Sequence, residues 1–143
     1  MSVTVRLLPW SEARDTARAI RYAVFVEEQG VPVELEWDDH DDVCWHAIAY
    51  DAAGTPVATG RLLPDGHIGR MAVLARARGI GIGALVLQAL MEKGEDLGYP
   101  QFVLNAQTHA TGFYRRAGFE PVGEPFEEAG IPHLEMRRVV RAG

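Results

Sequence analysis

The sequence is poor in cysteine and has no long apolar run. Its single cysteine, Cys44, rules out an internal disulfide and fits a reducing compartment. No apolar segment reaches the roughly 18 residues that a membrane span needs, and the N-terminus lacks the basic-then-apolar order of a signal peptide. We therefore expect a cytoplasmic protein without a membrane partner.

Lysine and arginine are also absent between Arg21 and Arg61, and carboxylates crowd the same stretch. Eight of the acidic residues in this gap lie between positions 27 and 42: Glu27, Glu28, Glu34, Glu36, Asp38, Asp39, Asp41 and Asp42. The net charge of −6 argues against a nucleic-acid partner, because neutralising phosphates requires clustered cations. The basic residues gather in the second half, so the chain divides into an acidic half and a half suited to an anionic ligand.

The 143 residues, 48% of them apolar, predict one domain spanning residues 1–143. Periodicity predicts a helix that starts after an N-cap at Ser11 and buries Ala13, Ala17, Ile20 and Val24. Alternation and turn signals predict an antiparallel meander over 47–50, 57–62 and 67–74, with further strands at 3–7, 101–105 and 133–139. Further helices are expected over 82–97 and 108–117. The fold class is therefore α/β, or α+β, with a mixed, mainly antiparallel sheet that carries helices on both faces.

A glycine-rich turn, 79–83, stands immediately before the helix predicted over 82–97. Its glycines let several backbone N–H groups converge on an anion, which the helix N-terminus also attracts. The turn is not a P-loop, because Ala84 and Leu85 stand where lysine and a hydroxyl residue are required. Its G-x-G-x-G spacing also differs from the G-x-G-x-x-G of dinucleotide-binding folds. The pattern that remains is an R-x-x-G-x-G turn at 78–83 that follows a predicted strand.

This turn resembles the acetyl-CoA pyrophosphate signature of the GCN5-related N-acetyltransferase (GNAT) superfamily. About thirty residues later, 113–119 resemble the F-Y-x-x-x-G-F segment that ends the second cofactor-contacting helix of that superfamily. Stretches 21–29, 105–109 and 127–133 are similar to the ElaA/YjcF-like branch, whose physiological substrates are generally not established. The resemblance covers nearly the whole chain and implies a GNAT-like fold.

The resemblance also implies an acetyl-CoA cosubstrate and assigns residues to it. Its pyrophosphate would bind at Arg78, Gly79, Ile80, Gly81, Ile82 and Gly83. Its pantetheine arm would pair with the preceding strand at Met71, Ala72 and Val73, and would also contact Asn105 and Tyr114. A backbone N–H of that strand would donate to the thioester oxygen.

Tyr114 is the candidate general acid, because a phenol with a pKa near 10 is protonated at neutral pH and can protonate a departing thiolate. The alternative for Tyr114 is packing beside Phe113. For the general base we favour His133, which leads into a strand next to two acids. His46, His109, Glu28 and Glu128 remain candidates, and each could be structural instead.

The substrate-binding residues that we predict are Glu28, Gln29, His46, Gln107 and His109. Together these features predict an acetyl-CoA-dependent N-acetyltransferase in which a primary amine of a small-molecule or peptidyl acceptor attacks the thioester directly. The acidic half favours a cationic acceptor. The alternatives are a non-catalytic acyl-CoA-binding or regulatory domain and a nucleotide-binding module, and a homodimer stays open.

The run of acids at 38–42 invites a metal hypothesis. It lacks the glycine and glutamate positions of an EF-hand loop, so we expect no metal and a solvated acidic loop bordering the acceptor site.

Overall fold

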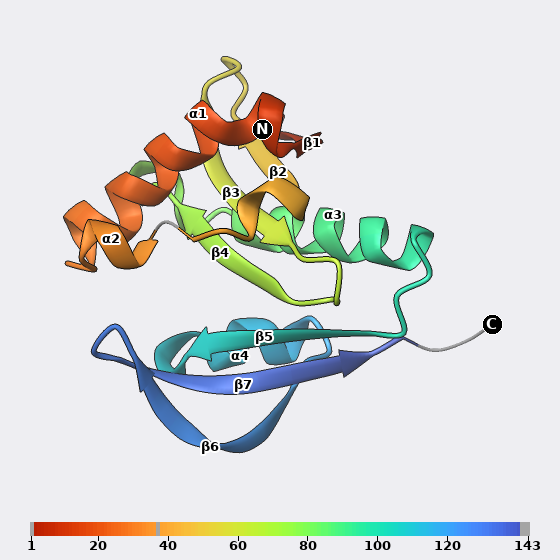
Figure 1. The fold of residues 1–143 in the computed structure, drawn as a ribbon. Helices are drawn as coiled ribbons and strands as arrows, with labels where there is room; N and C mark the ends of the chain where they lie inside the picture. Colours follow the sequence, from red (N-terminus) through yellow and green to blue (C-terminus); the bar gives the residue numbers. More distant parts are fainter. Residues whose placement is uncertain (1, 37, 141–143) are drawn as a thin grey trace.

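The computed structural model describes residues 2–36 and 38–140, whose strands form two sheets (Figure 1). The first sheet has four antiparallel strands in the order β1-β2-β3-β4. These strands are β1 (Thr4–Pro9), β2 (Trp45–Tyr50), β3 (Pro56–Leu62) and β4 (Ile68–Val73). The predicted meander is therefore confirmed as β2, β3 and β4.

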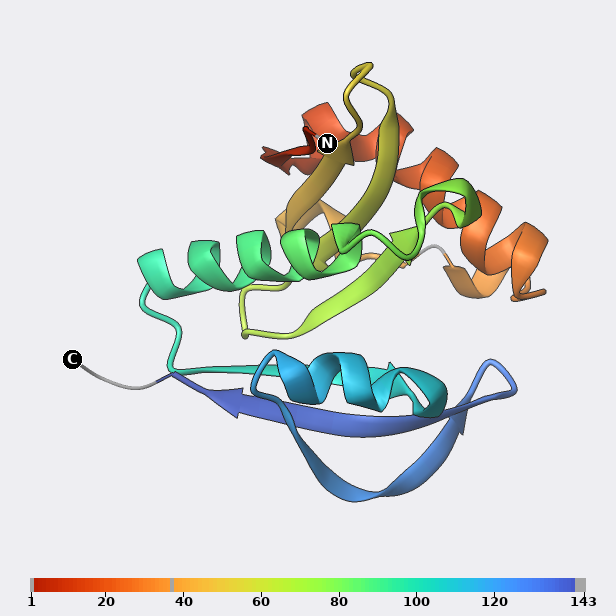
Figure 2. The same cartoon turned by 180° about the vertical axis from the view of Figure 1, so that it is seen from behind.

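The second sheet has three antiparallel strands in the order β5-β7-β6. Its strands are β5 (Gln101–Gln107), β6 (Glu120–Glu128) and β7 (Ile131–Val139). A parallel bridge between His67 and Val103 joins the two sheets, and there the Val103 N–H donates to the Gly66 carbonyl at 3.2 Å. Beyond this bridge β4 and β5 run in the same direction and separate, as both views show (Figures 1 and 2).

Helices cover both faces of the first sheet. Helix α1 (Trp10–Arg21), continued by a π-helix η1 (Tyr22–Glu28), packs on one face, and α3 (Ile82–Asp96) packs on the other. The shorter α4 (Thr111–Arg116) covers the second sheet on the same side as α3 (Figure 2). The remaining pieces are α2 (Val33–Glu36), η2 (Asp41–Val43), η3 (Ala75–Ala77) and η4 (Thr108–Ala110). No helix in residues 2–36 and 38–140 is long and apolar enough to cross a membrane.

Strand alternation divides the core between the two helix layers. In β2 the Ile48 side chain packs with Trp10, Ala13 and Ala17 under α1, whereas the side chains of its two neighbours join the larger cluster under α3. The predicted fold class, a mixed and mainly antiparallel sheet with helices on both faces, is confirmed. The split into two sheets adds a feature that the sequence pattern did not indicate.

The start of α1 differs from the prediction. The helix begins at Trp10 directly after β1, with Pro9 as its N-cap and no side-chain cap, so Ser11 lies inside the first turn. Proline supplies an extended residue and has no N–H that would be left unpaired, which lets the strand pass into the helix without a loop. The predicted apolar face is correct, because Ala13, Ala17 and Ile20 are all buried.

Candidate active site

A cavity of about 1000 Å³ opens where β4 and β5 diverge. Such a volume reaches the upper end of the range for small-molecule sites. Its walls come from η1, β3, β4, β5, η4, α4 and the β6–β7 turn. Among the lining residues are Glu28, Gln29, Asp38, Arg61, Arg70, Met71, Ala72, Val73, Arg78, Asn105, Gln107, His109, Tyr114, Glu128 and His133. The cavity therefore collects residues from segments that lie more than a hundred positions apart.

The glycine turn lies at the rim of this cavity. Gly79 and Gly81 adopt φ angles of 85° and 86°, and Gly81 caps α3. A Cβ built at either glycine meets no atom within 4 Å, so open space lies over this turn. The cavity lining includes Arg78, whereas residues 79–83 are outside it. Open space beside a positive-φ turn at a helix N-terminus fits a pyrophosphate group.

Arg78 is engaged by a carboxylate of η1. Its Nη1 and Nη2 donate to the two oxygens of Glu28 at 2.6 and 2.5 Å, and its Nε donates to the Val73 carbonyl at 3.0 Å. Hydrogen bonding to Arg78 lowers the pKa of Glu28. The pair joins the residue predicted for the pyrophosphate to a residue predicted for the acceptor.

Tyr114 lies in the cavity wall and packs edge-on against Phe113 and Phe119, with ring centroids 5.0 and 6.2 Å away. Desolvation raises the pKa of its phenol to about 12. The hydroxyl therefore keeps its proton throughout the physiological range. Tyr114 therefore packs against its aromatic neighbours and also carries a hydroxyl that can donate a proton.

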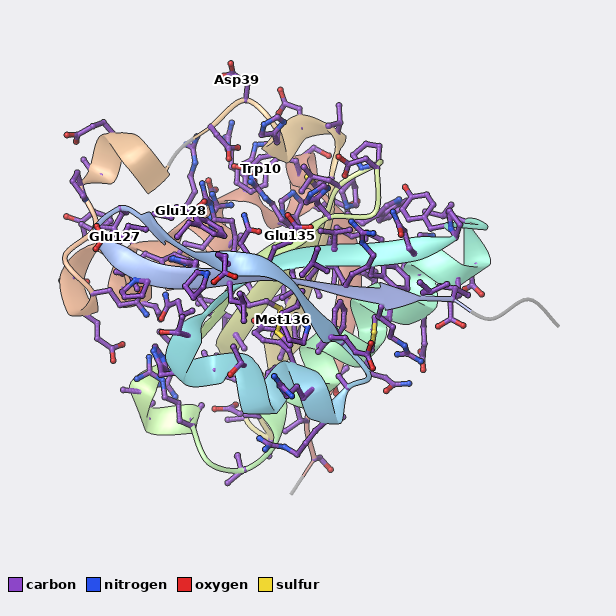
Figure 3. All side chains as sticks on the ribbon, turned by 90° about the horizontal axis from the view of Figure 1, so that it is seen from below. Trp10, Asp39, Glu127, Glu128, Glu135 and Met136 are labelled. Carbon is purple, nitrogen blue, oxygen red and sulfur yellow. The ribbon has the colours of Figure 1, made fainter. Side chains whose placement is uncertain are left out.

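His133 lies at the β6–β7 end of the cavity. Its Nδ1 is 2.7 Å from the Ile131 carbonyl, and its Nε2 is 3.6 Å from a Glu128 oxygen. A carbonyl only accepts, so Nδ1 carries the hydrogen in the neutral ring and Nε2 is the atom that can take a proton. Glu127 and Glu128 lie together at this turn (Figure 3), and Phe126 stacks on the imidazole at 6.0 Å.

Two glutamines close the space between η1 and β5. The Gln107 amide donates to the Gln29 side-chain oxygen at 3.0 Å, although 78 residues separate them. His109 follows β5 and also lines the cavity. Of the residues predicted for the acceptor, Glu28, Gln29, Gln107 and His109 therefore gather around one space.

His46 is the exception. It is 1% exposed and is not among the residues that line the cavity. Its Nε2 lies 3.0 Å from the Asp41 carbonyl, and its ring lies 4.7 Å from that of Trp10. Burial lowers the pKa of His46, so it is neutral. Its β2 position turns inward beneath α1, and we remove it from the acceptor site.

A buried network of arginines and aspartates borders the cavity, and the sequence did not predict it. Arg21 donates twice to Asp41 at 2.9 and 3.2 Å. Arg61 donates to Asp41 at 2.9 Å and, with both terminal nitrogens, to Asp38 at 2.8 and 2.7 Å. Arg70 also donates to Asp38, at 3.2 Å. The two arginines that bound the acidic stretch in sequence therefore meet its carboxylates in space.

This network corrects the expectation of a solvated acidic loop. Asp41 is 4% exposed, whereas Asp39 points away from the molecule (Figure 3). Burial alone would raise the pKa of Asp41, but hydrogen bonds and charge from Arg21 and Arg61 outweigh it and lower this pKa. The expected border with the acceptor site is supported for Asp38, which lines the cavity.

Cys44 lies beside this network and its thiol is 3.1 Å from the His40 carbonyl. Burial raises the pKa of Cys44 to about 11, so little thiolate forms at neutral pH. Within the residues that the structure describes, no three histidine, cysteine or carboxylate side chains are grouped to hold a metal ion.

The comparisons with known proteins point to one family. The model of the acetyltransferase (GNAT) domain matches residues 25–140. The chain belongs to the GNAT acetyltransferase family. It is 40% identical over 123 residues to YjcF, an uncharacterized N-acetyltransferase of Bacillus subtilis, covering 83% of this chain and 87% of YjcF. Protein ElaA of Escherichia coli is 34% identical over 129 residues, with 85% of this chain and 84% of ElaA covered.

Solved structures agree with this assignment. The crystal structure of Escherichia coli ElaA matches with a TM-score of 0.84 and 29% identity, covering 96% of this chain and 99% of ElaA. An acyl-CoA N-acyltransferase from Pseudomonas aeruginosa matches with a TM-score of 0.81 and 33% identity, over 96% and 99% of the two chains. The GNAT protein described here is thus an acyltransferase of the ElaA/YjcF-like branch.

Proposed function

We propose that this GNAT protein transfers an acetyl group from acetyl-CoA to a primary amine of a small-molecule or peptidyl acceptor, by direct attack of the amine on the thioester. The observation that carries the proposal is the single cavity between β4 and β5. It brings the Arg78 end of the glycine turn, Tyr114 and His133 to one space. A reaction between two substrates gains most of its rate from holding both in such a space.

Acetyl-CoA would be held by two segments. Its pyrophosphate would bind to Arg78 and the turn at 79–83, whose open space and positive φ angles suit an anion. Its pantetheine arm would lie along Met71, Ala72 and Val73 of β4, with Asn105 of β5 on the other side. The β4 backbone would then donate an N–H to the thioester oxygen.

The proposed chemistry needs proton transfers at both substrates. The amine nitrogen bonds to the acyl carbon, the carbon–sulfur bond breaks, and the departing thiolate takes the proton of the Tyr114 hydroxyl. The nitrogen, positively charged after attack, gives up its remaining excess proton, and this proton restores the Tyr114 hydroxyl. Burial raises the pKa of Tyr114, so the phenol is protonated whenever the thioester binds, as a proton donor must be. An alkylammonium must also lose a proton before attack, and Nε2 of His133 is our proposed acceptor of it.

A screen of amines that follows free thiol release from acetyl-CoA tests the proposal. We expect at least one amine to give turnover above the hydrolysis background. Tyr114→Phe should abolish most of this turnover, whereas Tyr99→Phe, a matched change at a partly buried tyrosine outside the cavity, should not. Thermal stabilisation by acetyl-CoA with no thiol release from any amine would instead identify the non-catalytic acyl-CoA-binding alternative.

A further inference from the structure

Two arginines form part of the cavity wall on the side of the first sheet. Arg61 comes from β3 and Arg70 from β4, and both line the cavity together with Asp38. The Asp38 carboxylate accepts hydrogen bonds from both, so it holds the two guanidinium groups side by side. The side chain of Arg61 is 7% exposed and that of Arg70 is 26% exposed. The pair is therefore fixed in place, with Arg70 the more open of the two.

An irregularity of β4 brings Arg70 to this wall. The β3–β4 register shifts between Thr59 and Arg61, so Arg70 and Met71 both stand opposite Gly60. Such a bulge breaks the alternation of side chains along a strand. Arg70 adopts a φ of 50°, one of two positive φ angles among the described residues other than glycine.

The core on the other face shows what this bulge achieves. Ile68 and Met71 both pack in the core under α3, although residues three apart in a regular strand point to opposite faces. Met71 covers Gly60 so closely that a Cβ there would lie 2.6 Å from its sulfur. The extra residue of the bulge, Arg70, therefore lies on the cavity side. Its left-handed backbone costs conformational energy. The strand thus keeps its core contacts and still presents Arg70 to the cavity.

Other residues of the cavity lining have the complementary chemistry. They are Glu128, His133 with its Nε2, and Tyr114. The network has three arginines, Arg21, Arg61 and Arg70, against the two aspartates Asp38 and Asp41, so a simple cationic amine would meet a net positive charge there. A carboxylate at the same place would meet the guanidinium of Arg70, whose side chain is 26% exposed, with the charge of Arg61 beside it.

We infer that the acceptor is a zwitterion, an amine that also carries a carboxylate, and that Arg70 with Arg61 binds the carboxylate while the amine faces His133. The inference rests on the proposed amine acetylation and narrows its substrate class. It also revises the expectation of a cationic acceptor, because the carboxylates of Asp38 and Asp41 that suggested one are paired with arginines.

Matched acceptors test this inference in the full chain. Amino acids from glycine to 6-aminohexanoate are compared with their carboxamides and with aminoalkylphosphonates of equal length, by kcat/KM for thiol release. We expect the best acid to exceed its carboxamide at least tenfold, and the chain-length series to give the separation of amine and carboxylate. Preference for the phosphonate over the acid, or an acid-to-amide ratio near one, overturns the carboxylate assignment.

Variants test whether Arg70 causes the preference for the acid over its carboxamide. Arg70→Asn removes the guanidinium, and asparagine tolerates a positive φ, so the backbone can stay in place. We expect the acid-to-amide ratio to fall below twofold in Arg70→Asn. Arg137→Asn is the control, because Arg137 is also a strand arginine near a carboxylate, Glu135 at 3.6 Å, but lies outside the cavity lining. A ratio retained in Arg70→Asn overturns the role of Arg70.

Binding of the acetylated products separates this inference from the proposed function. The best N-acetyl amino acid and its amide are titrated into the wild-type protein with CoA present, by calorimetry. Tighter binding of the acid that is lost in Arg70→Asn supports the inference even if no amine gives thiol release, which would count against the proposed function alone. Turnover of amines with equal binding of acid and amide refutes the inference and leaves the proposed function standing.

Discussion

The glycine turn offers the sharpest test of acyl-CoA binding, through Gly81→Val. Gly81 has a φ of 86°, and a Cβ there meets nothing within 4 Å, so the added side chain clashes with no protein atom. The cost is that of a left-handed backbone, about 1–2 kcal/mol or more for a β-branched residue. For a domain of this size that corresponds to a fall in Tm of about 3–8 °C.

Gly81→Val should also weaken the binding of acetyl-CoA, beyond its effect on the stability of the fold. The new side chain either occupies the open space over the turn or flips the turn and moves its N–H groups. Loss of one hydrogen bond to a charged group is worth about 1.5–3 kcal/mol. We therefore expect the Kd for acetyl-CoA to rise about 10- to 100-fold, measured by calorimetry at fixed ionic strength.

Gly54→Val is the matched control. Gly54 has a φ of 81° in the β2–β3 turn, and a Cβ there also meets nothing within 4 Å. It should lower Tm by a similar amount and leave acetyl-CoA affinity unchanged. Gly83→Ala should keep the fold, since Gly83 lies within α3 and the nearest atom to a new Cβ is the Phe113 ring at 3.4 Å. Wild-type affinity in folded Gly81→Val would refute the pyrophosphate assignment.

Three further outcomes are expected. Tyr114→Phe keeps the contacts with its aromatic neighbours and should lower the single-turnover rate about 10²- to 10⁴-fold with little change in acetyl-CoA affinity, and a rate within twofold of wild type would make it structural. Glu28→Gln weakens the ion pair with Arg78, with which the pyrophosphate must compete for this guanidinium. Acetyl-CoA should therefore bind several-fold more tightly in calorimetry, and weaker binding would contradict this competition. Asp41 has a lowered pKa in the folded state, so its contribution to stability is present above about pH 4 and is lost as the pH falls further. Asp41→Asn removes the carboxylate that accepts two hydrogen bonds from buried Arg21, and should lower the free energy of unfolding by about 3–5 kcal/mol in urea at pH 7. The fall in stability between pH 5 and 3 should also be smaller in this variant than in the wild type.

Local patterns predicted most of the elements because their causes are local. The apolar spacing of α1, the turn residues between β2 and β3, and the glycines before α3 all act within a few positions. The strand β6 escaped prediction because it carries Pro121 and Pro125 and is exposed along its whole length. Among the described strands β6 pairs with β7 alone, and an edge strand of this kind has no buried face to impose an alternating pattern.

The sequence by itself determined the family and predicted an anion-binding role for the turn at 78–83 and a catalytic role for Tyr114, because each depends on residue types at fixed short spacing. Only the tertiary structure decided which side chains meet. It removed His46 to the core, joined Glu28 to Arg78, and paired the acidic stretch with arginines from either end of it. These contacts join segments far apart in the sequence, and the β4 bulge that brings Arg70 to the cavity depends on strand register, so neither leaves a local signature in the chain.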